Sequence, residues 1–339
     1  MPKVSVVIAS YNRARFIGEC IESVLSQSFR DFEILVVDDG SEDNTREVVS
    51  TYCPRVKYFH QVNQGAPAAY NRGIEVARGE YVAFLDSDDA LTEDALRMGV
   101  DVLNRWPDVG ISYGQSYVID EYSHVKGLRK PPYDRESYVR SGKEEIKRLI
   151  LGNYITSSTT MIRRICFEVV GLFDNRFRSG SEDFDMWIRL LRKYDVAYID
   201  RPLAKYRVHN STLSAGRQVE DVKWAHGLIL KAVFNDVERG NLYHSLKESA
   251  YYHFYCRLAR IAISKGDAKT ARNYLVKALK TSPMAPFWLD SADWPSLWAK
   301  TVLPTSFINF GRRAKRHLGR LTGRSSRRFP EQELSGDIP

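Results

Sequence analysis

Strand-like and helix-like runs alternate along residues 1–215 of this 339-residue chain. Residues 4–9 and 32–37 are short, apolar and β-branched, whereas residues 14–26 between them repeat apolar side chains at helical spacing. Such alternation is typical of a mostly parallel sheet whose strands are joined by crossover helices. The sequence therefore predicts an α/β fold with its ligand site beyond the carboxyl ends of the strands. The same patterns predict strands at 56–59, 81–85, 110–118, 158–162 and 196–199, helices at 44–50, 66–78, 92–106 and 183–194, and a loop at 120–141.

The run Tyr81-Val-Ala-Phe-Leu-Asp86-Ser-Asp88-Asp89 places three carboxylates where a buried strand ends. Three acids within four residues repel one another, and burying them uncompensated costs free energy. A divalent cation removes that conflict, and carboxylate oxygens suit Mg²⁺ or Mn²⁺ shared with substrate phosphates. The alternative is an acidic turn that caps the helix expected near Thr92, because Asp is a good N-cap residue.

A second acidic segment, Asp38-Asp39-Gly40-Ser41, follows the second expected strand. A carboxylate at a strand end can accept a hydrogen bond from a ribose hydroxyl or a base N–H, so the two acidic segments fit a nucleotide lying across the sheet edge. Ser10-Tyr11-Asn12-Arg13 adds an aromatic face for stacking and an arginine for phosphate. The alternative for the second segment is a type I turn. The chain has no GxGxxG and no GxxxxGKS, so neither a dinucleotide-binding fold nor a P-loop is indicated.

The positive charge is concentrated near the C-terminus. Residues 300–328 hold nine of the 50 Lys and Arg residues and no acid, which leaves 41 basic against 42 acidic residues elsewhere. This distribution argues against specific nucleic-acid binding by the body. The segment predicts an amphipathic helix on an anionic membrane surface, with a docked partner helix or an unspecific polyanion-binding tail as alternatives. The apolar face would consist of Phe307, Phe310, Ala314, Leu318 and Leu321.

The cellular compartment is expected to be the cytoplasm, with peripheral attachment to the cytoplasmic face of the membrane. The four cysteines are scattered without a CxxC pattern, which argues against a disulfide framework or a zinc site. The chain has no apolar run long enough to span a membrane, and it opens on Met1-Pro2-Lys3 directly before a strand, without a secretory signal.

Helical patterns replace strands after residue 215. Residues 252–283 fit one tetratricopeptide-like hairpin with its turn at Gly266-Asp267. A single copy is too short for a repeat array, so a hairpin packed on the catalytic domain is expected. The predicted domains are 1–215, 216–285 and an aromatic, then basic tail at 286–339.

Four ordered motifs within residues 3–212 resemble the family 2 glycosyltransferases. The resemblance implies a GT-A fold, here with a C-terminal all-α extension, together with a nucleotide-sugar donor, a divalent metal and inversion at the anomeric carbon. The motifs are VSVVIASYNRARFIGECIESVLSQSFRDFEILVVDDGSEDNT, Asn63-Gln-Gly65 with Asn71-Arg-Gly73-Ile74, Phe84-Leu-Asp86-Ser-Asp88-Asp89, and Gly180-Ser-Glu182-Asp183 leading to Trp187-Ile-Arg189-Leu190.

The resemblance also implies roles for single residues. Tyr11 and Asp39 are similar to the uracil contacts, with Arg13 beside them, and Asp86 is similar to the residue that faces the ribose. Asp88 is similar to the direct metal ligand. The donor-binding set is completed by Ser10, Gly65 and Asn71. The chain departs from many relatives at Ala69-Tyr70-Asn71, where an arginine that could meet the diphosphate is missing.

Asp183, with Glu182 beside it, resembles the catalytic base. An inverting transfer needs one general base for the acceptor hydroxyl, while charge neutralisation by a metal activates the leaving diphosphate. The alternative is that both acids only stabilise a helix N-terminus. His209 is a second predicted metal ligand, and a packing role is its alternative.

The predicted activity is transfer of a sugar from a UDP-sugar to a hydroxyl of a glycan or lipid-linked glycan during cell-surface polysaccharide synthesis. The cofactor is expected to be Mn²⁺ or Mg²⁺. Specificity is expected to depend on the 120–141 loop and on residues 153–160. A catalytically inactive scaffold and a nucleotidyltransferase are the alternatives.

Overall fold

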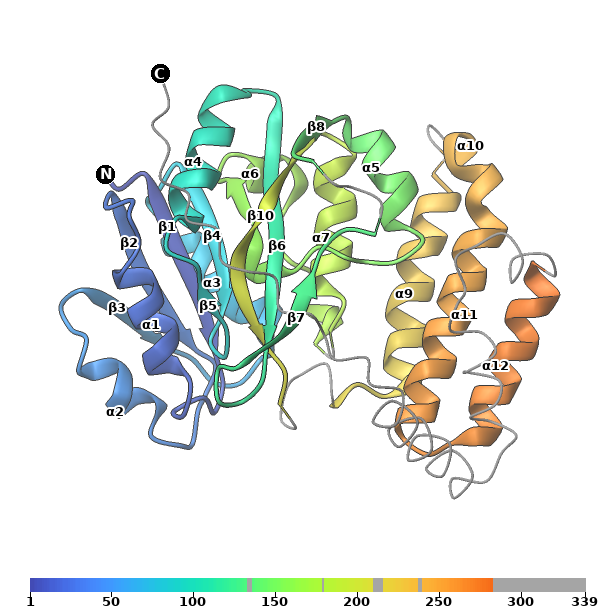
Figure 1. Ribbon diagram of the computed structural model, residues 1–339, viewed down its shortest axis with the longest axis horizontal. Coiled ribbons are helices and arrows are strands. Elements are labelled where there is room, and N and C mark those ends of the chain that lie inside the picture. Colours follow the sequence, from blue (N-terminus) through green and yellow to red (C-terminus); the bar gives the residue numbers. More distant parts are fainter. Residues whose placement is uncertain (133–135, 179, 210–215, 237–239, 283–339) are drawn as a thin grey trace, which may run out of the picture.

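A computed structural model describes residues 1–132, 136–178, 180–209, 216–236 and 240–282. Figure 1 shows a twisted sheet flanked by helices, with a further group of helices beside it. The predicted basic tail, residues 286–339, lies outside the described residues.

The central sheet is mostly parallel, as the alternating pattern predicts. Its strand order is β3-β2-β1-β4-β9-β6-β10-β5, and β9 and β5 run antiparallel to their neighbours. The first four long strands are parallel, so their carboxyl ends meet at one edge. The eight strands in this order are β1 (Val4–Ser10), β2 (Phe32–Asp38), β3 (Val56–His60), β4 (Tyr81–Asp86), β5 (Ala90–Leu91), β6 (Val109–Ile119), β9 (Met161–Arg163) and β10 (Asp195–Arg207).

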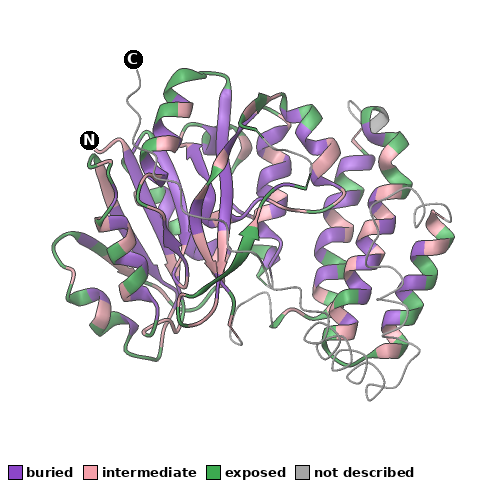
Figure 2. Ribbon diagram, in the orientation of Figure 1, coloured by how far each residue is buried: buried purple, intermediate pink, exposed green. Residues whose placement is uncertain are grey.

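Two helical layers bury the two faces of this sheet, which explains why the strands read as continuous apolar runs. Val6 packs with Ile17 in the core on one face, whereas the next residue, Val7, packs with Ile74 on the other. Figure 2 shows the resulting buried strands. The first layer contains α1 (Ile17–Leu25), α2 (Thr45–Ser50) and α4 (Ala95–Arg105), and the second contains α3 (Ala66–Val76), α5 (Gly142–Leu149), α6 (Cys166–Val170) and α7 (Glu182–Leu191).

The C-terminal helices pack on the second layer and lie to the right in Figure 1. Phe184 of α7 belongs to the same apolar core as Val222 and Leu258 of these helices. The last two helices form a hairpin whose turn contains Gly266-Asp267, as predicted, and Asp267 caps the final helix by accepting a hydrogen bond from the Thr270 N–H. The helices are α9 (Val219–Phe234), α10 (Gly240–Tyr243), α11 (Lys247–Ser264) and α12 (Ala268–Thr281).

Three local predictions were wrong. The predicted 120–141 loop contains β7 (Val125–Arg129) and β8 (Tyr138–Arg140), which pair with β6 and β10. Four of the five β7 residues are exposed, so the strand lacks an apolar pattern. The strand predicted at 158–162 begins instead at Met161, after a 3₁₀ turn, Ser157–Thr159, in which the Thr159 hydroxyl donates to the Thr156 carbonyl. The strand predicted at 196–199 continues to residue 207 past a register shift at Pro202, because pairing with β6 outweighs the local break.

Candidate active site

One cavity of about 530 Å³ lies at the carboxyl ends of β1, β2 and β4. It brings together side chains from the N-terminal strands and from the first turn of α7, which are far apart in the sequence. Most of the predicted site residues line it, namely Ser10, Tyr11, Arg13, Asp39, Gly65, Asp86, Asp88 and Asp183.

The two carboxylates at the end of β2, Asp38 and Asp39, have different partners. Asp38 accepts hydrogen bonds from Ser41 N and the Tyr58 hydroxyl, which is the turn role proposed as the alternative. Asp39 faces the cavity and accepts from Gln61 Nε2, Gln64 N and Gly65 N at 2.8, 2.9 and 2.7 Å. Since a carboxylate has about four acceptor positions, Asp39 keeps room for one ligand donor.

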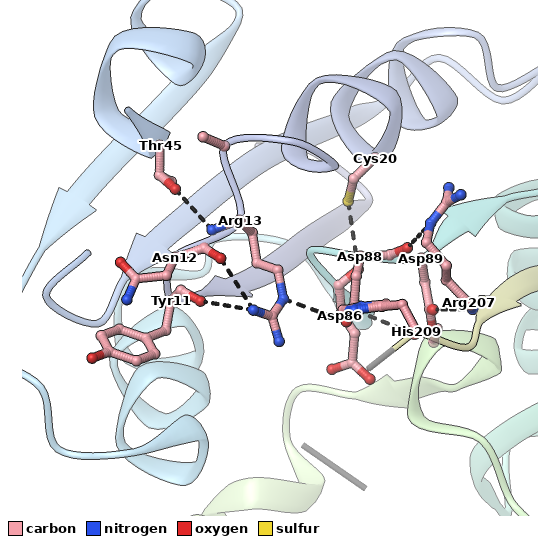
Figure 3. A network of polar contacts seen from close by, with 12 residues as sticks. Tyr11, Asn12, Arg13, Cys20, Thr45, Asp86, Asp88, Asp89, Arg207 and His209 are labelled. Carbon is pink, nitrogen blue, oxygen red and sulfur yellow. Dashed lines mark hydrogen bonds and ion pairs between the residues drawn. The ribbon is translucent and has the colours of Figure 1, made fainter. Parts of the chain in front are cut away.

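Tyr11 and Arg13, in the loop after β1, both line the cavity. Figure 3 shows the Arg13 side chain extending toward the acids after β4. Tyr11 as a residue is 44% exposed, which leaves it available for stacking. Arg13 Nη1 donates to the carbonyls of Tyr11 and Asn12, and Arg13 Nε lies 3.4 Å from Asp88 Oδ2. Ser10 Oγ at the strand end is buried and, among the described residues, has no hydrogen-bond partner.

The three acids after β4 are held in different ways. Asp89 accepts from the Ser158 hydroxyl at 2.6 Å and from Arg207 N at 2.8 Å, so it fixes the loop. Arg207 Nε also donates to the Asp88 carbonyl at 2.7 Å. The N-cap of α4 is Asp94, so the helix-capping alternative for the acidic run is wrong. Asp86 and Asp88 are left to face the cavity.

Tyr70 accounts for the departure from the family pattern at this position. Its buried hydroxyl donates a hydrogen bond to Asp86 Oδ1. Burial, and next the charge of Asp88, raise the pKa of Asp86 to about 6, whereas the bond from Tyr70 opposes that rise. Tyr70 thus supports the carboxylate of Asp86, at the position where the resemblance implied an arginine.

Asp88 and His209 are the candidate metal ligands. Asp88 Oδ2 and His209 Nε2 lie 2.9 Å apart and form a hydrogen bond. The same distance is close to the roughly 3.0 Å between neighbouring ligands on an octahedral ion with bonds of about 2.1 Å, so a cation can take the place of the shared proton. The His209 ring also packs on Phe16, with centroids 4.7 Å apart. In the described part of the chain, no group of three or more His, Cys, Asp or Glu side chains is placed to hold an ion alone. The donor set therefore fits a cation whose other ligands are substrate phosphates.

Asp183 and Glu182 occupy the first turn of α7 and line the cavity, but their surroundings differ. Asp183 Oδ2 accepts a hydrogen bond from Asn153 Nδ2 at 3.0 Å. Glu182 is buried, and its Oε2 has no hydrogen-bond partner among the described residues. Burial, and next the charge of Asp183, raise the pKa of Glu182 to about 8. Glu182 is therefore mostly protonated near pH 7.

Asn71 lies outside the cavity lining, unlike the other predicted donor-binding residues. Its Nδ2 donates to the Phe173 carbonyl at 2.8 Å and to Asn175 Oδ1 at 3.1 Å, and its Oδ1 accepts from Phe173 N at 2.8 Å. In this structure the side chain joins α3 to the segment before α7. No pattern in the sequence around Asn71 predicts this contact between distant segments.

Several residues that line the cavity carry no signal in the sequence. Gly65 has a φ of +94°, and a Cβ there would approach Arg178 Cγ to 3.3 Å, so the absence of a side chain lets this arginine cover the cavity edge. The sequence motifs do not predict that these arginines meet, because they come from separate segments with no shared spacing. The arginines not predicted as site residues are Arg129, Arg178, Arg207, Arg217 and Arg257.

Comparison with known proteins identifies the family of this chain. The model of the family described as "Glycosyl transferase family 2" matches residues 5–171. The putative teichuronic acid biosynthesis glycosyltransferase TuaG of Bacillus subtilis is 31% identical over 70% of this chain and 89% of its own length. The chain belongs to glycosyltransferase family 2. A second relative, the uncharacterized glycosyltransferase RT0329 of Rickettsia typhi, is 28% identical over 82% of this chain and 89% of its own length.

Solved structures resemble this family 2 glycosyltransferase in fold. S. aureus TarS 1-349 in complex with UDP-GlcNAc has a TM-score of 0.57 and 16% identity, over 84% of this chain and 92% of that chain. The mannosyltransferase PcManGT from Pyrobaculum calidifontis, in complex with GDP-Man and Mn²⁺, has a TM-score of 0.54 and 18% identity, over 89% of this chain and 85% of its own. The predicted GT-A fold is confirmed. Within the described ranges, no helix has both the length and the apolar composition needed to cross a membrane.

Proposed function

We propose that this family 2 glycosyltransferase moves a sugar from a UDP-sugar to a hydroxyl of a glycan or lipid-linked glycan, with inversion at the anomeric carbon. The observation that carries the proposal is that Asp88 and Asp183 line the same cavity from different parts of the fold. One belongs to the acidic loop after β4, and the other to the first turn of α7.

In this proposal the nucleotide lies across the ends of β1, β2 and β4. Tyr11 stacks on the base, and the remaining acceptor position of Asp39 takes a base N–H. Asp86 accepts from the ribose. TarS bound to UDP-GlcNAc supports a UDP-linked donor for this fold, although PcManGT binds GDP-Man.

Asp183 acts as the general base. It takes the proton from the acceptor hydroxyl as that oxygen attacks the anomeric carbon, and the bond from this carbon to the diphosphate oxygen breaks on the opposite side. Asn153 holds the carboxylate in place for this step. Bound at Asp88 and His209, Mn²⁺ or Mg²⁺ would supply charge neutralisation for the leaving diphosphate.

The cellular role that we propose is polysaccharide synthesis at the cytoplasmic face of the membrane. TuaG is named for teichuronic acid biosynthesis, which supports a cell-surface glycan as the product. We also propose the division into a transferase domain at 1–215, a helical domain at 216–285 and a membrane-binding tail at 286–339. The tail lies outside the described residues, so its amphipathic pattern alone supports that part.

Calorimetry with UDP, dTDP and GDP, each with Mn²⁺ and with EDTA, tests the donor site. We expect UDP to bind in the micromolar range only with the metal. Hydrolysis of UDP-sugars in the absence of acceptor then tests for chemistry. Wild-type protein that bound no nucleotide under any condition would favour the catalytically inactive scaffold.

A further inference from the structure

Three arginines line the part of the cavity around Asp183 and come from three separate elements. Arg129 ends β7, Arg217 precedes α9, and Arg257 lies in α11. The C-terminal helices thus contribute directly to the wall of the cavity. None of the three guanidinium groups forms an ion pair or a hydrogen bond with another described residue, although Arg129 lies over the ring of Tyr206.

The other arginines of the cavity differ in this respect. Arg207 pairs with Glu19 at 2.6 Å, and Arg13 lies 3.4 Å from Asp88. Arg178 reaches the Asn63 carbonyl at 3.3 Å, close to Gly65 on the nucleotide side. More positive charge than Asp183 balances is therefore concentrated on the side of the catalytic base.

Arg217 is closely packed yet unsatisfied. A Cβ on Gly180, whose φ is +104°, would lie 2.6 Å from Arg217 Nε, so this glycine makes room for the guanidinium. Arg217 Nε is buried and has no hydrogen-bond partner among the described residues. Glu182 does not neutralise it near pH 7, because burial raises the pKa of Glu182 to about 8.

The pKa of Arg257 reflects the repulsion among these three arginines. Burial, and next the charge of Arg217, lower the pKa of Arg257 to about 10, and Arg129 adds to the effect. Arg257 also lines a second cavity of about 190 Å³, so it borders open space on two sides. Asp183 offsets only part of this repulsion, because one carboxylate faces three guanidinium groups. Like charges in such excess are costly unless an anion binds among them.

We propose that Arg129, Arg217 and Arg257 form a subsite for a carboxylate or phosphate group carried by the sugar substrates, separate from the diphosphate of the nucleotide. This inference rests on the proposed function, because it is the role of Asp183 as base that places the acceptor at this end of the cavity. The guanidinium fork matches both anions in two-point hydrogen bonding. The charged group belongs to the acceptor or to the transferred sugar.

The test has an acceptor arm and a donor arm. The acceptor arm uses calorimetry on full-length protein saturated with UDP and Mn²⁺. The probes are trigalacturonic acid against maltotriose, and glucose 6-phosphate against glucose. We expect at least one anionic probe to bind about tenfold or more tightly than its neutral counterpart. Arg257→Gln and Arg129→Gln should remove most of this preference and leave UDP affinity within about twofold. Arg72→Gln, on α3 and outside the cavity, makes the same charge change and should keep the preference.

The donor arm compares UDP-glucuronic acid with UDP-glucose in the same variants. A preference that appears only here, and disappears with Arg257→Gln, assigns the anion to the transferred sugar. No preference in either arm, or a tenfold loss of UDP affinity in Arg257→Gln, would overturn the subsite.

Repeating the acceptor arm without nucleotide separates the two proposals, because wild-type protein that binds the anion but no UDP refutes only the proposed function. Arg129→Gln, on an exposed strand, keeps the test decisive if the α11 variant does not fold.

Discussion

Asn153 Nδ2 donates a hydrogen bond of 3.0 Å to Asp183 Oδ2, and this contact fixes a carboxylate that faces the cavity. The other oxygen, Oδ1, accepts from Phe184 N at 2.7 Å. Asn153 follows α5, so a separate segment orients the candidate base. The alternative role, stabilising the N-terminus of α7, uses Oδ1, which accepts from Phe184 N. It gives no reason for the bond from Asn153 to Oδ2, whereas a general base needs to be held in a fixed orientation.

Asp183→Asn should preserve donor binding and remove transfer. The amide is similar in size but cannot take the acceptor proton, so the rate of sugar transfer should fall roughly 10²–10⁴-fold. UDP affinity measured by calorimetry should stay within about twofold of wild type. Asp101→Asn, an exposed site on α4, serves as the control. Transfer at the original rate in the Asp183 variant would show that another group is the base.

Asp88→Ala should abolish the metal dependence of the reaction. Loss of the carboxylate removes a ligand that would share the cation with the diphosphate, and turnover with Mn²⁺ should fall roughly 10²–10³-fold. The measurement is initial rate against Mn²⁺ concentration, with Asp101→Ala as control. A variant whose Mn²⁺ titration matched wild type would refute the assignment of Asp88.

Tyr70→Phe should weaken nucleotide binding. The variant keeps the ring but loses the hydrogen bond to Asp86 Oδ1, so the UDP dissociation constant with Mn²⁺ should rise about five- to tenfold. Tyr81→Phe is a matched control, because its hydroxyl donates to Asn104 at 2.7 Å, away from the cavity. Both variants should lose about 1 kcal/mol of stability. Equal UDP affinity in both would mean that Tyr70 has only a structural role.

Glu182→Gln should change how stability depends on pH. The folded protein holds the Glu182 proton up to a pKa of about 8, against an ordinary value of 4.5, so stability is greatest below the lower value and is lost as pH rises through the higher one. The loss should amount to a few kcal/mol in wild type and be absent in the variant. Melting temperatures near pH 5 and near pH 9 measure it, with the half-exposed Glu144→Gln as control. Parallel pH curves for Glu182→Gln and wild type would contradict the raised pKa.

Arg207→Lys should destabilise the acidic loop. The buried guanidinium donates to the Asp88 carbonyl, the Ser123 hydroxyl and Glu19 Oε2 at 2.7, 2.9 and 2.6 Å. A lysine cannot reproduce this fork, so the free energy of unfolding should fall by about 2–4 kcal/mol. Urea denaturation measures it, and Arg97→Lys on the surface of α4 is the control. An unchanged unfolding midpoint would show that the clamp is dispensable.

Some parts of the fold could be predicted because their causes are local. Strands β1, β2 and β4 lie within one residue of their predicted bounds, since burial on both faces leaves a continuous apolar run. Strand β7 could not be predicted, because backbone pairing with β6 holds an exposed segment in place. The length of β10 was missed for a related reason, as pairing overrides the break at Pro202.

The sequence by itself determined the α/β class, the acidic strand ends and the motifs that place Asp88 and Asp183 in a glycosyltransferase family. Those features depend on side-chain type and on spacing along a few turns of chain. Only the tertiary structure decided that Tyr70 supports Asp86, that Asn153 orients Asp183, and that Arg257 of a C-terminal helix reaches the cavity. These contacts join segments whose separation in the sequence carries no periodic pattern, so packing of the whole chain determines them.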